Sequence, residues 1–203
     1  MLNNPGARRV IAGVIEPPAR LLLALHVSPD AVTVVGTIGA SAAALWFIPR
    51  GDFLWALLIV LVFALSDLLD GTMARLRGTS GPWGNFLDAT LDRVTDAAIF
   101  ASVALYGAAH ANAWITGGAL LALATGQVVS YAKARAEAVG GTANVGIAER
   151  AERLIITGVG VLFAGFGITL ALTIAMWVVG ALGLITIVQR MVHVRRQLAG
   201  SRD

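Results

Sequence analysis

Four aspartates form two closely spaced pairs in the middle of the chain. Asp67 and Asp70 are three residues apart, and Asp88 and Asp92 are four residues apart. Either spacing projects both side chains to nearly one face of an α-helix, so two antiparallel helices would present the pairs to each other. Four carboxylates in apolar surroundings repel one another unless cations neutralise them. Oxygen ligands select hard ions, so the pattern predicts Mg²⁺ or Mn²⁺, and four aspartates suffice for two ions that bridge a diphosphate.

Smaller and basic residues accompany the aspartates at fixed positions. They are Gly71, Ala74, Arg75 and Gly84. A glycine beside Asp70 leaves room for a ligand to approach the backbone, and the arginine one turn later can reach a phosphate oxygen. Alternatively, the acids could form a structural network with Arg75, Arg77 and Arg93. Such a network would not demand the two glycines and the alanine, so the pattern favours a ligand site.

The rest of the chain is too apolar for a soluble domain. Of its 203 residues 57% are hydrophobic and 13% charged, and the mean hydropathy is +0.78. These values predict a membrane protein. The net charge of +3 could indicate nucleic-acid binding. In so apolar a chain, however, basic residues mark cytoplasmic membrane edges, so we expect no nucleic-acid partner. The absence of cysteine excludes disulfides, thiolate metal sites and cysteine nucleophiles.

Uncharged runs predict how many helices cross the membrane. Residues 31–48 and 53–75 suit one span each, and a third begins near Trp83. The uncharged runs 97–132 and 154–189 would each extend about 54 Å as one helix, whereas the hydrocarbon core is about 30 Å thick. Breaks are therefore expected at 107–112 and 165–167. The fold class predicted is an all-α integral membrane protein with six transmembrane helices.

The basic residues predict the orientation. Six spans place both termini on one side, and if that side is cytoplasmic nearly all basic residues at helix ends lie there. These residues are Arg8, Arg9, Arg20, Arg75, Arg77, Lys133, Arg135, Arg150, Arg153, Arg190, Arg195, Arg196 and Arg202. Arg50 lies outside. Residues 8–26 are basic on one side and apolar on the other, which predicts an interfacial amphipathic helix before the spans. We therefore expect an N-terminal segment 1–29, a membrane domain 30–197 and a short tail 198–203.

The complete acidic pattern, D-x2-D-G-x2-A-R-x8-G-x3-D-x3-D, resembles the signature of the CDP-alcohol phosphotransferases. Members of that family displace CMP from a CDP-alcohol with the hydroxyl of a second alcohol. The resemblance implies metal ligation by Asp67, Asp70, Asp88 and Asp92, with Asp92 also acting as general base. It also implies a six-helix homodimer in the bacterial cell membrane, with its termini and active site on the cytoplasmic side.

A second element of the family contacts the cytidine. Pro29 to Thr33 matches its P-[DN]-x-x-T pattern, although the same residues could be a plain helix start. By the resemblance, the residues that contact the CDP-lipid are Asp30, Ala31, Val32, Thr33, Gly71, Arg75 and Ser80.

The acceptor alcohol depends on basic residues outside the acidic motif. Cations that converge near a metal site could bind an acceptor that carries phosphate, or they could be ordinary flanks of membrane helices. The segments S-Y-A-K-A-R-A-E and I-A-E-R-A-E-R-L-I-I and the late V-Q-R resemble the actinobacterial phosphatidylinositol phosphate synthases. That resemblance implies CDP-diacylglycerol and inositol 1-phosphate as substrates. The implied acceptor-phosphate ligands are Lys133, Arg135, Arg153 and Arg190.

Two other functions stay open at this point. Glycerol 3-phosphate also carries a phosphate, so the chain could make phosphatidylglycerol phosphate instead. A divalent-cation transporter could also hold metal on membrane aspartates. Against a transporter, the acids cluster in one half of two helices without matching polar residues in the other half.

Overall fold

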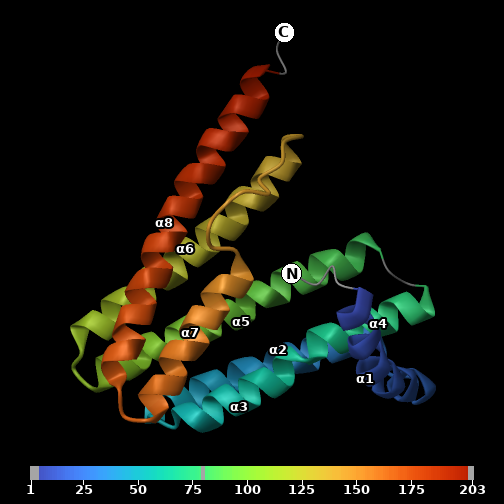
Figure 1. Ribbon diagram of the computed structural model, residues 1–203, viewed down its shortest axis with the longest axis horizontal. Helices are drawn as coiled ribbons and strands as arrows, with labels where there is room; N and C mark the ends of the chain where they lie inside the picture. The colour runs from blue at the N-terminus through green and yellow to red at the C-terminus, as the bar shows by residue number, and fades with distance from the viewer. Residues whose placement is uncertain (1–4, 79–80, 201–203) are drawn as a thin grey trace. The chain divides into compact units, whose positions relative to one another are not determined.

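The computed structural model describes residues 5–78 and 81–200, and every regular element in these ranges is helical (Figure 1). The elements are α1 (Pro5–Ala24), α2 (Pro29–Phe47), the 3-10 helix η1 (Ile48–Arg50), α3 (Phe53–Ala64), α4 (Ser66–Arg77), α5 (Pro82–Ala109), α6 (Ala113–Ala138), α7 (Arg150–Gly165) and α8 (Thr169–Gly200). The predicted all-α class is confirmed. The chain divides into two compact units. Unit 1 combines the chain up to Ala43 with Leu58–Thr95, and unit 2 combines Ala44–Leu57 with the chain from Asp96 onward.

In unit 1, glycines bring α2 close to the α3–α4 segment. A Cβ added at Gly36 would lie 2.9 Å from the Cβ of Ser66, and one added at Gly39 would lie 2.3 Å from the ring of Phe63. Neither position has room for a larger residue, because real Cβ atoms essentially never approach other atoms so closely. Small residues allow such close packing of membrane helices. The predicted second span, 53–75, is interrupted at Leu65, where α3 ends and α4 begins.

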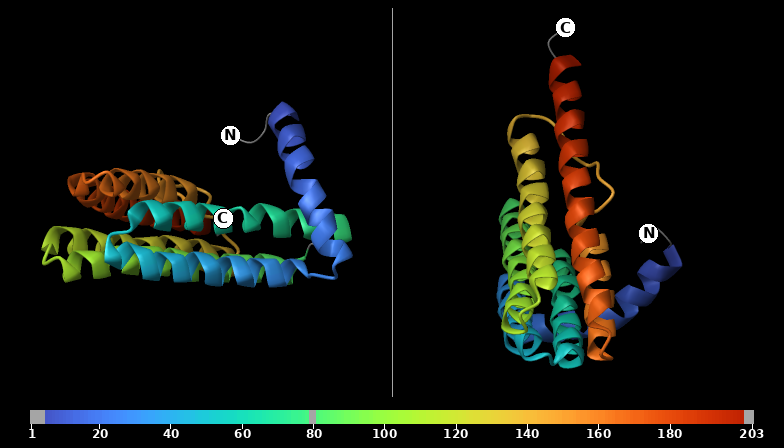
Figure 2. Two further views of the ribbon diagram at one scale, coloured as in Figure 1. Left: turned by 90° about the horizontal axis from the view of Figure 1, so that it is seen from below. Right: turned by 90° about the vertical axis from the view of Figure 1, so that its left-hand side faces the viewer.

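A serine hydroxyl bonds back to its own helix beside the interruption. The hydroxyl of Ser66 donates a hydrogen bond to the carbonyl oxygen of Phe63. A serine hydroxyl that bonds back to its own helix competes with the backbone ladder and often bends the helix. Asp67 follows directly, so the break begins a new helix just before the first acidic pair. Helix α4 also contacts α1. In Figure 2, α1 points away from α4 at a steep angle.

In unit 2, α8 packs against both α6 and α7 (Figures 1 and 2). Glycines again mark the contacts. A Cβ at Gly183 would lie 2.5 Å from the Oγ1 of Thr125 on α6, and one at Gly160 on α7 would lie 2.6 Å from the Cβ of Ala175. Close backbone approach therefore holds these three helices together.

Both predicted breaks in the long uncharged runs are confirmed. Helix α5 ends at Ala109, and Asn112 caps α6 by accepting a hydrogen bond from the Ile115 N–H at 3.1 Å. Helix α7 ends at Gly165, and the chain turns through Gly167, whose φ of +87° suits glycine.

Four helical segments of the described chain are long and apolar enough to cross a membrane. They are Pro29–Arg50, Phe53–Arg77, Ala113–Ala138 and Thr169–Ala199. Large apolar side chains on these segments are exposed, such as Trp55 and Leu170, as expected of surfaces that face lipid. Two of the six predicted spans are not among them. Helix α5 carries charges in its first half, and α7 has 16 residues. The six-span count and the orientation stay predictions.

Candidate functional site

The four motif aspartates come from two helices of unit 1. Asp67 and Asp70 lie on α4, and Asp88 and Asp92 lie on α5. Asp70 is buried, Asp92 is half-buried, and Asp67 and Asp88 are exposed. Asp67 and Asp88 are close enough to Asp70 for their charges to repel its carboxylate. The structure thus brings Asp88 of the second pair near Asp70 of the first, while a metal site shared by all four carboxylates stays a prediction.

Asp70 is fixed by a residue of α2. The Oγ1 of Thr33 lies 2.5 Å from the Oδ2 of Asp70, and both side chains are 8% exposed. The same hydroxyl lies 3.2 Å from the carbonyl oxygen of Pro29, in the first turn of α2. The sequence singled out Thr33 and Asp70 for different roles, and the structure joins them directly.

A second contact ties the start of α2 to α5. The indole Nε1–H of Trp83 donates to the Oδ2 of Asp30 at 2.9 Å, and the Trp83 ring lies against Phe86 with centroids 5.9 Å apart. Sequence reasoning did not predict this contact of Trp83, because nothing in the local pattern pairs it with an acid 53 residues away. Ala31 is exposed and Val32 half-buried on the same turn of α2.

The donor set suits a hard divalent cation, although the side chains do not yet converge. Among the described residues, no three histidine, cysteine, aspartate or glutamate side chains stand close enough to share one metal ion. The available ligands are all carboxylates, which is the chemistry that Mg²⁺ and Mn²⁺ prefer. A Cβ added at Gly71 would meet nothing within 4 Å, so the space beside Asp70 is open.

The contacts of Arg75 and Arg93 do not form a structural network around Asp70. Arg75 donates to the Oγ1 of Thr72 on its own helix at 2.9 Å, and Arg93 lies 3.8 Å from the Oδ2 of Asp92. Arg75 is exposed, so its guanidinium is accessible to a ligand. Ser80 lies outside the described residues.

Two of the predicted acceptor residues lie against the loop between α6 and α7. Arg153 is 1% and Arg190 4% exposed. Arg190 donates from Nε to the Val145 carbonyl at 2.9 Å and from Nη1 to the Val129 carbonyl at 2.6 Å, and Arg153 donates from Nη1 to the Ala148 carbonyl at 3.5 Å. The structure therefore brings these two cations to one loop of unit 2.

The other two predicted acceptor residues lie near the end of α6. Lys133 is half-buried, and Arg135 is exposed in the last turn. Neither is buried as Arg153 and Arg190 are.

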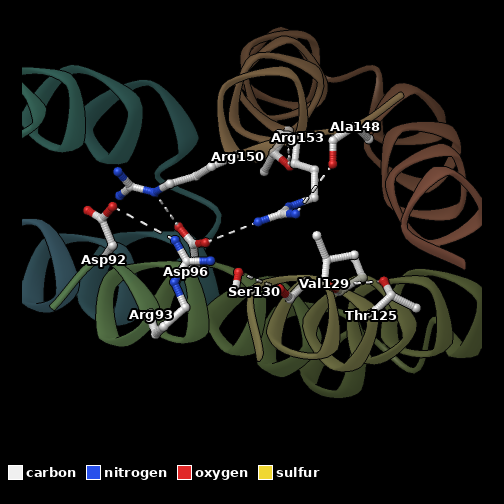
Figure 3. Close-up of polar contacts among 12 residues, drawn as sticks. Asp92, Arg93, Asp96, Thr125, Val129, Ser130, Ala148, Arg150 and Arg153 are labelled. Atoms are coloured by element: carbon white, nitrogen blue, oxygen red, sulfur yellow. Dashed lines mark hydrogen bonds and ion pairs between the residues drawn. The ribbon is translucent and has the colours of Figure 1, made fainter. Parts of the chain in front are cut away.

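A further buried acid, Asp96, lies beside Arg153 (Figure 3). Asp96 of α5 is 3% exposed, and its carboxylate contacts two arginines of α7, Arg150 at 3.1 Å and Arg153 at 3.5 Å. The sequence did not single out Asp96. One signal was available, because Asp96 follows Asp92 by the same four-residue step that separates Asp88 from Asp92.

Comparison with known proteins gives close relatives over nearly the whole chain. A phosphatidylinositol phosphate synthase of Streptomyces avermitilis is 47% identical over 204 residues, which cover 97% of this chain and 84% of the relative. A phosphatidylinositol phosphate synthase of Mycobacteroides abscessus is 42% identical, covering 97% of this chain and 90% of the relative.

Solved structures give the same answer. The phosphatidylinositol phosphate synthase of Mycobacterium tuberculosis with CDP-DAG bound superimposes with a TM-score of 0.86 at 40% identity, covering 90% of this chain and 94% of that one. The same enzyme in complex with manganese and citrate has a TM-score of 0.83, covering 88% and 87%. A model of the CDP-alcohol phosphatidyltransferase family matches residues 26–195. The chain belongs to the CDP-alcohol phosphatidyltransferase family, and its close relatives are actinobacterial phosphatidylinositol phosphate synthases.

Proposed function

We propose that the chain transfers the phosphatidyl group of CDP-diacylglycerol to inositol 1-phosphate, giving phosphatidylinositol phosphate and CMP. The observation that carries this proposal is the complete acidic motif on α4 and α5 of one unit, with its buried member, Asp70, fixed by Thr33 of α2. Relatives up to 47% identical bear the name of this activity, and one was solved with CDP-DAG bound.

On the donor side, the first turns of α2 and the open space at Gly71 are the parts of the chain that we assign to the CDP group. Thr33 and Asp70 are already joined, and among the described residues no side chain from elsewhere in the chain comes within 4 Å of a Cβ built at Gly71. A diphosphate could therefore approach the α4 backbone there, with the exposed guanidinium of Arg75 one turn away to donate to its oxygens. Asp30, Ala31, Val32 and Ser80 complete the proposed donor contacts.

We assign metal ligation to Asp67, Asp70, Asp88 and Asp92, for Mg²⁺ or Mn²⁺ and most simply for two ions. A relative was solved with manganese. When bound, such ions neutralise the diphosphate and make CMP a better leaving group. The protein contributes the carboxylates, and Thr33 keeps Asp70 oriented so that less reorganisation is needed on binding.

Asp92 is assigned the role of general base. A hydroxyl oxygen of the acceptor attacks the phosphorus that carries the diacylglycerol, the bond from that phosphorus to the CMP oxygen breaks, and the hydroxyl proton passes to the Asp92 carboxylate. Arg93 lies 3.8 Å from that carboxylate.

On the acceptor side, we assign the inositol 1-phosphate group to Arg153 and Arg190, with Lys133 and Arg135 in support. Two buried guanidiniums present fixed donors to a phosphate. We further propose that residues 30–197 form a six-span domain of the bacterial cell membrane with both termini and the active site cytoplasmic, and that the protein works as a homodimer.

The first prediction concerns the acceptor. Purified protein in detergent, given CDP-diacylglycerol and Mg²⁺ or Mn²⁺, should release CMP when inositol 1-phosphate is added and should do so far more slowly with free inositol or serine. Glycerol 3-phosphate provides the comparison between two phosphorylated acceptors, and mass spectrometry of the lipid identifies the product. A preference for free inositol or serine would contradict the proposed binding of an acceptor phosphate by Arg153 and Arg190. Metal-dependent ion flux in liposomes without CMP release would instead favour a transporter.

The second prediction separates base from ligand at Asp92. Asp92→Asn should lower kcat by roughly 100-fold or more, because an amide cannot accept the proton, while CDP-diacylglycerol binding stays within about threefold of wild type. Asp67→Asn is the matched comparison, since an exposed ligand on the other helix should weaken the metal dependence instead. If Asp92→Asn abolishes donor and metal binding, Asp92 is primarily a ligand.

A further inference from the structure

We propose that Asp96 is a positioning residue for acceptor binding. Its buried carboxylate holds Arg153, and secondarily Arg150, in the orientation in which Arg153 receives the phosphate of the acceptor. This inference rests on the proposed function, since it assumes that the acceptor is phosphorylated.

The geometry of Asp96 is that of a carboxylate shared between two guanidiniums (Figure 3). Its Oδ1 accepts from the Nε of Arg150 at 3.1 Å, and its Oδ2 lies 3.5 Å from the Nη2 of Arg153. The two arginines are three residues apart in the first turn of α7, so both point to the same side of that helix. One acid on α5 therefore fixes the cationic start of α7.

Arg153 is held on further sides. Its Nη1 donates to the Ala148 carbonyl at 3.5 Å, and its side chain passes over Gly126 of α6, where an added Cβ would lie 3.7 Å from the Nε. The Ala148 carbonyl is itself in place because the Ala148 N–H donates to the Thr186 hydroxyl of α8 at 3.2 Å. A long side chain confined in this way has little rotamer freedom left to lose when it binds an anion.

The buried charges of unit 2 do not balance. Among the residues that the structure describes there, the charged side chains classed as buried are Asp96, Arg153 and Arg190. Arg190 pairs with Glu149, whose Oε1 lies 3.9 Å from its Nη2 and whose side chain is exposed. A buried cation that is only partly compensated is costly, and the positive end of the α7 dipole adds to the cost. A bound phosphate would supply the missing negative charge.

A purely structural role for Asp96 makes a different prediction. A carboxylate that only stabilised the fold would affect thermal stability and every kinetic constant together. A carboxylate that acts through Arg153 should affect the acceptor selectively, and its effect should vanish once Arg153 is altered.

The test uses the full chain in detergent, with Asp96→Asn as the main variant. Asparagine keeps the size of the side chain but replaces one accepting oxygen with an NH₂ group that repels a guanidinium. We expect the KM for inositol 1-phosphate to rise roughly 10- to 100-fold, with kcat and the KM for CDP-diacylglycerol within about threefold of wild type. Glu152→Gln is the matched control, because it removes an exposed acid from the same turn of α7 and should leave all three constants unchanged.

Two additional measurements keep the test decisive. In a protein that already carries Arg153→Lys, adding Asp96→Asn should raise the KM for inositol 1-phosphate less than about threefold. The reason is that Asp96 acts through the guanidinium of Arg153, which the first substitution has removed. The thermal midpoint of wild type should rise with added inositol 1-phosphate, and that of Asp96→Asn should not. If Asp96→Asn fails to fold, Asp96→Glu replaces it, and we expect a smaller rise in acceptor KM because the charge is kept but displaced.

The outcomes separate the two proposals. Wild type that uses free inositol as well as inositol 1-phosphate overturns the proposed function. Wild type that prefers inositol 1-phosphate, together with an Asp96→Asn variant of normal acceptor KM, overturns the role of Asp96 alone. A loss of stability and of kcat without an acceptor-specific change also overturns it, since that pattern marks a structural residue.

Discussion

Asp70 shows how one side chain from another helix fixes the position of a buried carboxylate. It is the buried member of the four motif acids, and Thr33 of α2 lies 2.5 Å away with its hydroxyl directed to the carboxylate. A hydrogen bond to a charged group contributes about 1.5–3 kcal/mol. The P-[DN]-x-x-T element therefore does more than begin α2, because its threonine also holds the buried aspartate of the acidic motif.

Removal of that hydroxyl gives the third prediction. Thr33→Val keeps the shape of the side chain but removes the side-chain donor to Asp70, which keeps its backbone hydrogen bond from Gly71. The concentration of Mn²⁺ for half-maximal CMP release should rise roughly tenfold or more, because the carboxylate must be oriented when the metal binds. Thr37→Val, one turn later on α2, controls for the loss of a threonine hydroxyl from this helix. Equal metal dependence of Thr33→Val and wild type would contradict the role assigned to the hydroxyl.

The sequence predicted which candidate site residues share a helix face, but it did not predict which side chains from different helices contact each other. Helix periodicity fixes neighbours three or four residues apart, so the spacing of the aspartates alone places each pair on one helix face. The Trp83–Asp30 bond and the Asp96–Arg153 pair depend on how whole helices pack. No local spacing encodes such a contact, which is why both were missed.

At the scale of the helix, breaks marked by glycine or by excess length were predictable, and the break inside an apolar run was not. The turns after α5 and α7 fall where the uncharged runs exceed the bilayer thickness. The interruption at Leu65 lies in a run without proline or glycine, beside a serine hydroxyl that donates to the carbonyl of Phe63. Ser102 donates to Ile99 in the same way inside the uninterrupted α5, so a serine in the sequence does not predict a break.

The two kinds of glycine in unit 1 give the fourth prediction. Gly71→Ala should leave the thermal stability unchanged or raise it by about 0.5–1 kcal/mol, because alanine suits a helix interior and its Cβ would meet nothing. The affinity for CDP-diacylglycerol should nevertheless fall, because the methyl group fills the open space beside Asp70. Both quantities are measured on the detergent-solubilised protein, by thermal unfolding and by donor titration.

Gly36→Ala is the matched comparison. Its Cβ would lie 2.9 Å from the Cβ of Ser66, so α2 and α4 must shift, at a cost of about 1–3 kcal/mol in stability. Destabilisation by Gly71→Ala, or normal donor affinity of that variant, would show that Gly71 is a packing glycine like Gly36.

At the scale of the whole molecule, the number of spans rests on α5 and α7. Four helical segments are long and apolar enough to be spans. Helices α5 and α7 are not among them, because half of α5 is charged and α7 is short. A helix of 16 residues is about 24 Å long, somewhat less than the hydrocarbon core of about 30 Å. Helix α7 can still cross if the basic residues of its first turn reach the interface.

The fifth prediction tests this topology with single cysteines, which is straightforward because the natural chain has none. With six spans and cytoplasmic termini, a membrane-impermeant thiol reagent should label Asp52→Cys and Ile168→Cys in spheroplasts. It should reach Asn144→Cys and Arg196→Cys only after the membrane is opened. All four positions are exposed, so access to the reagent depends on the side of the membrane and not on burial. The pair Asn144 and Ile168 is decisive for α7, since labelling of both from the same side would mean that α7 does not cross. The chain would then have an odd number of spans and its termini on opposite sides, and the positive-inside argument would no longer place the acidic helices toward the cytoplasm.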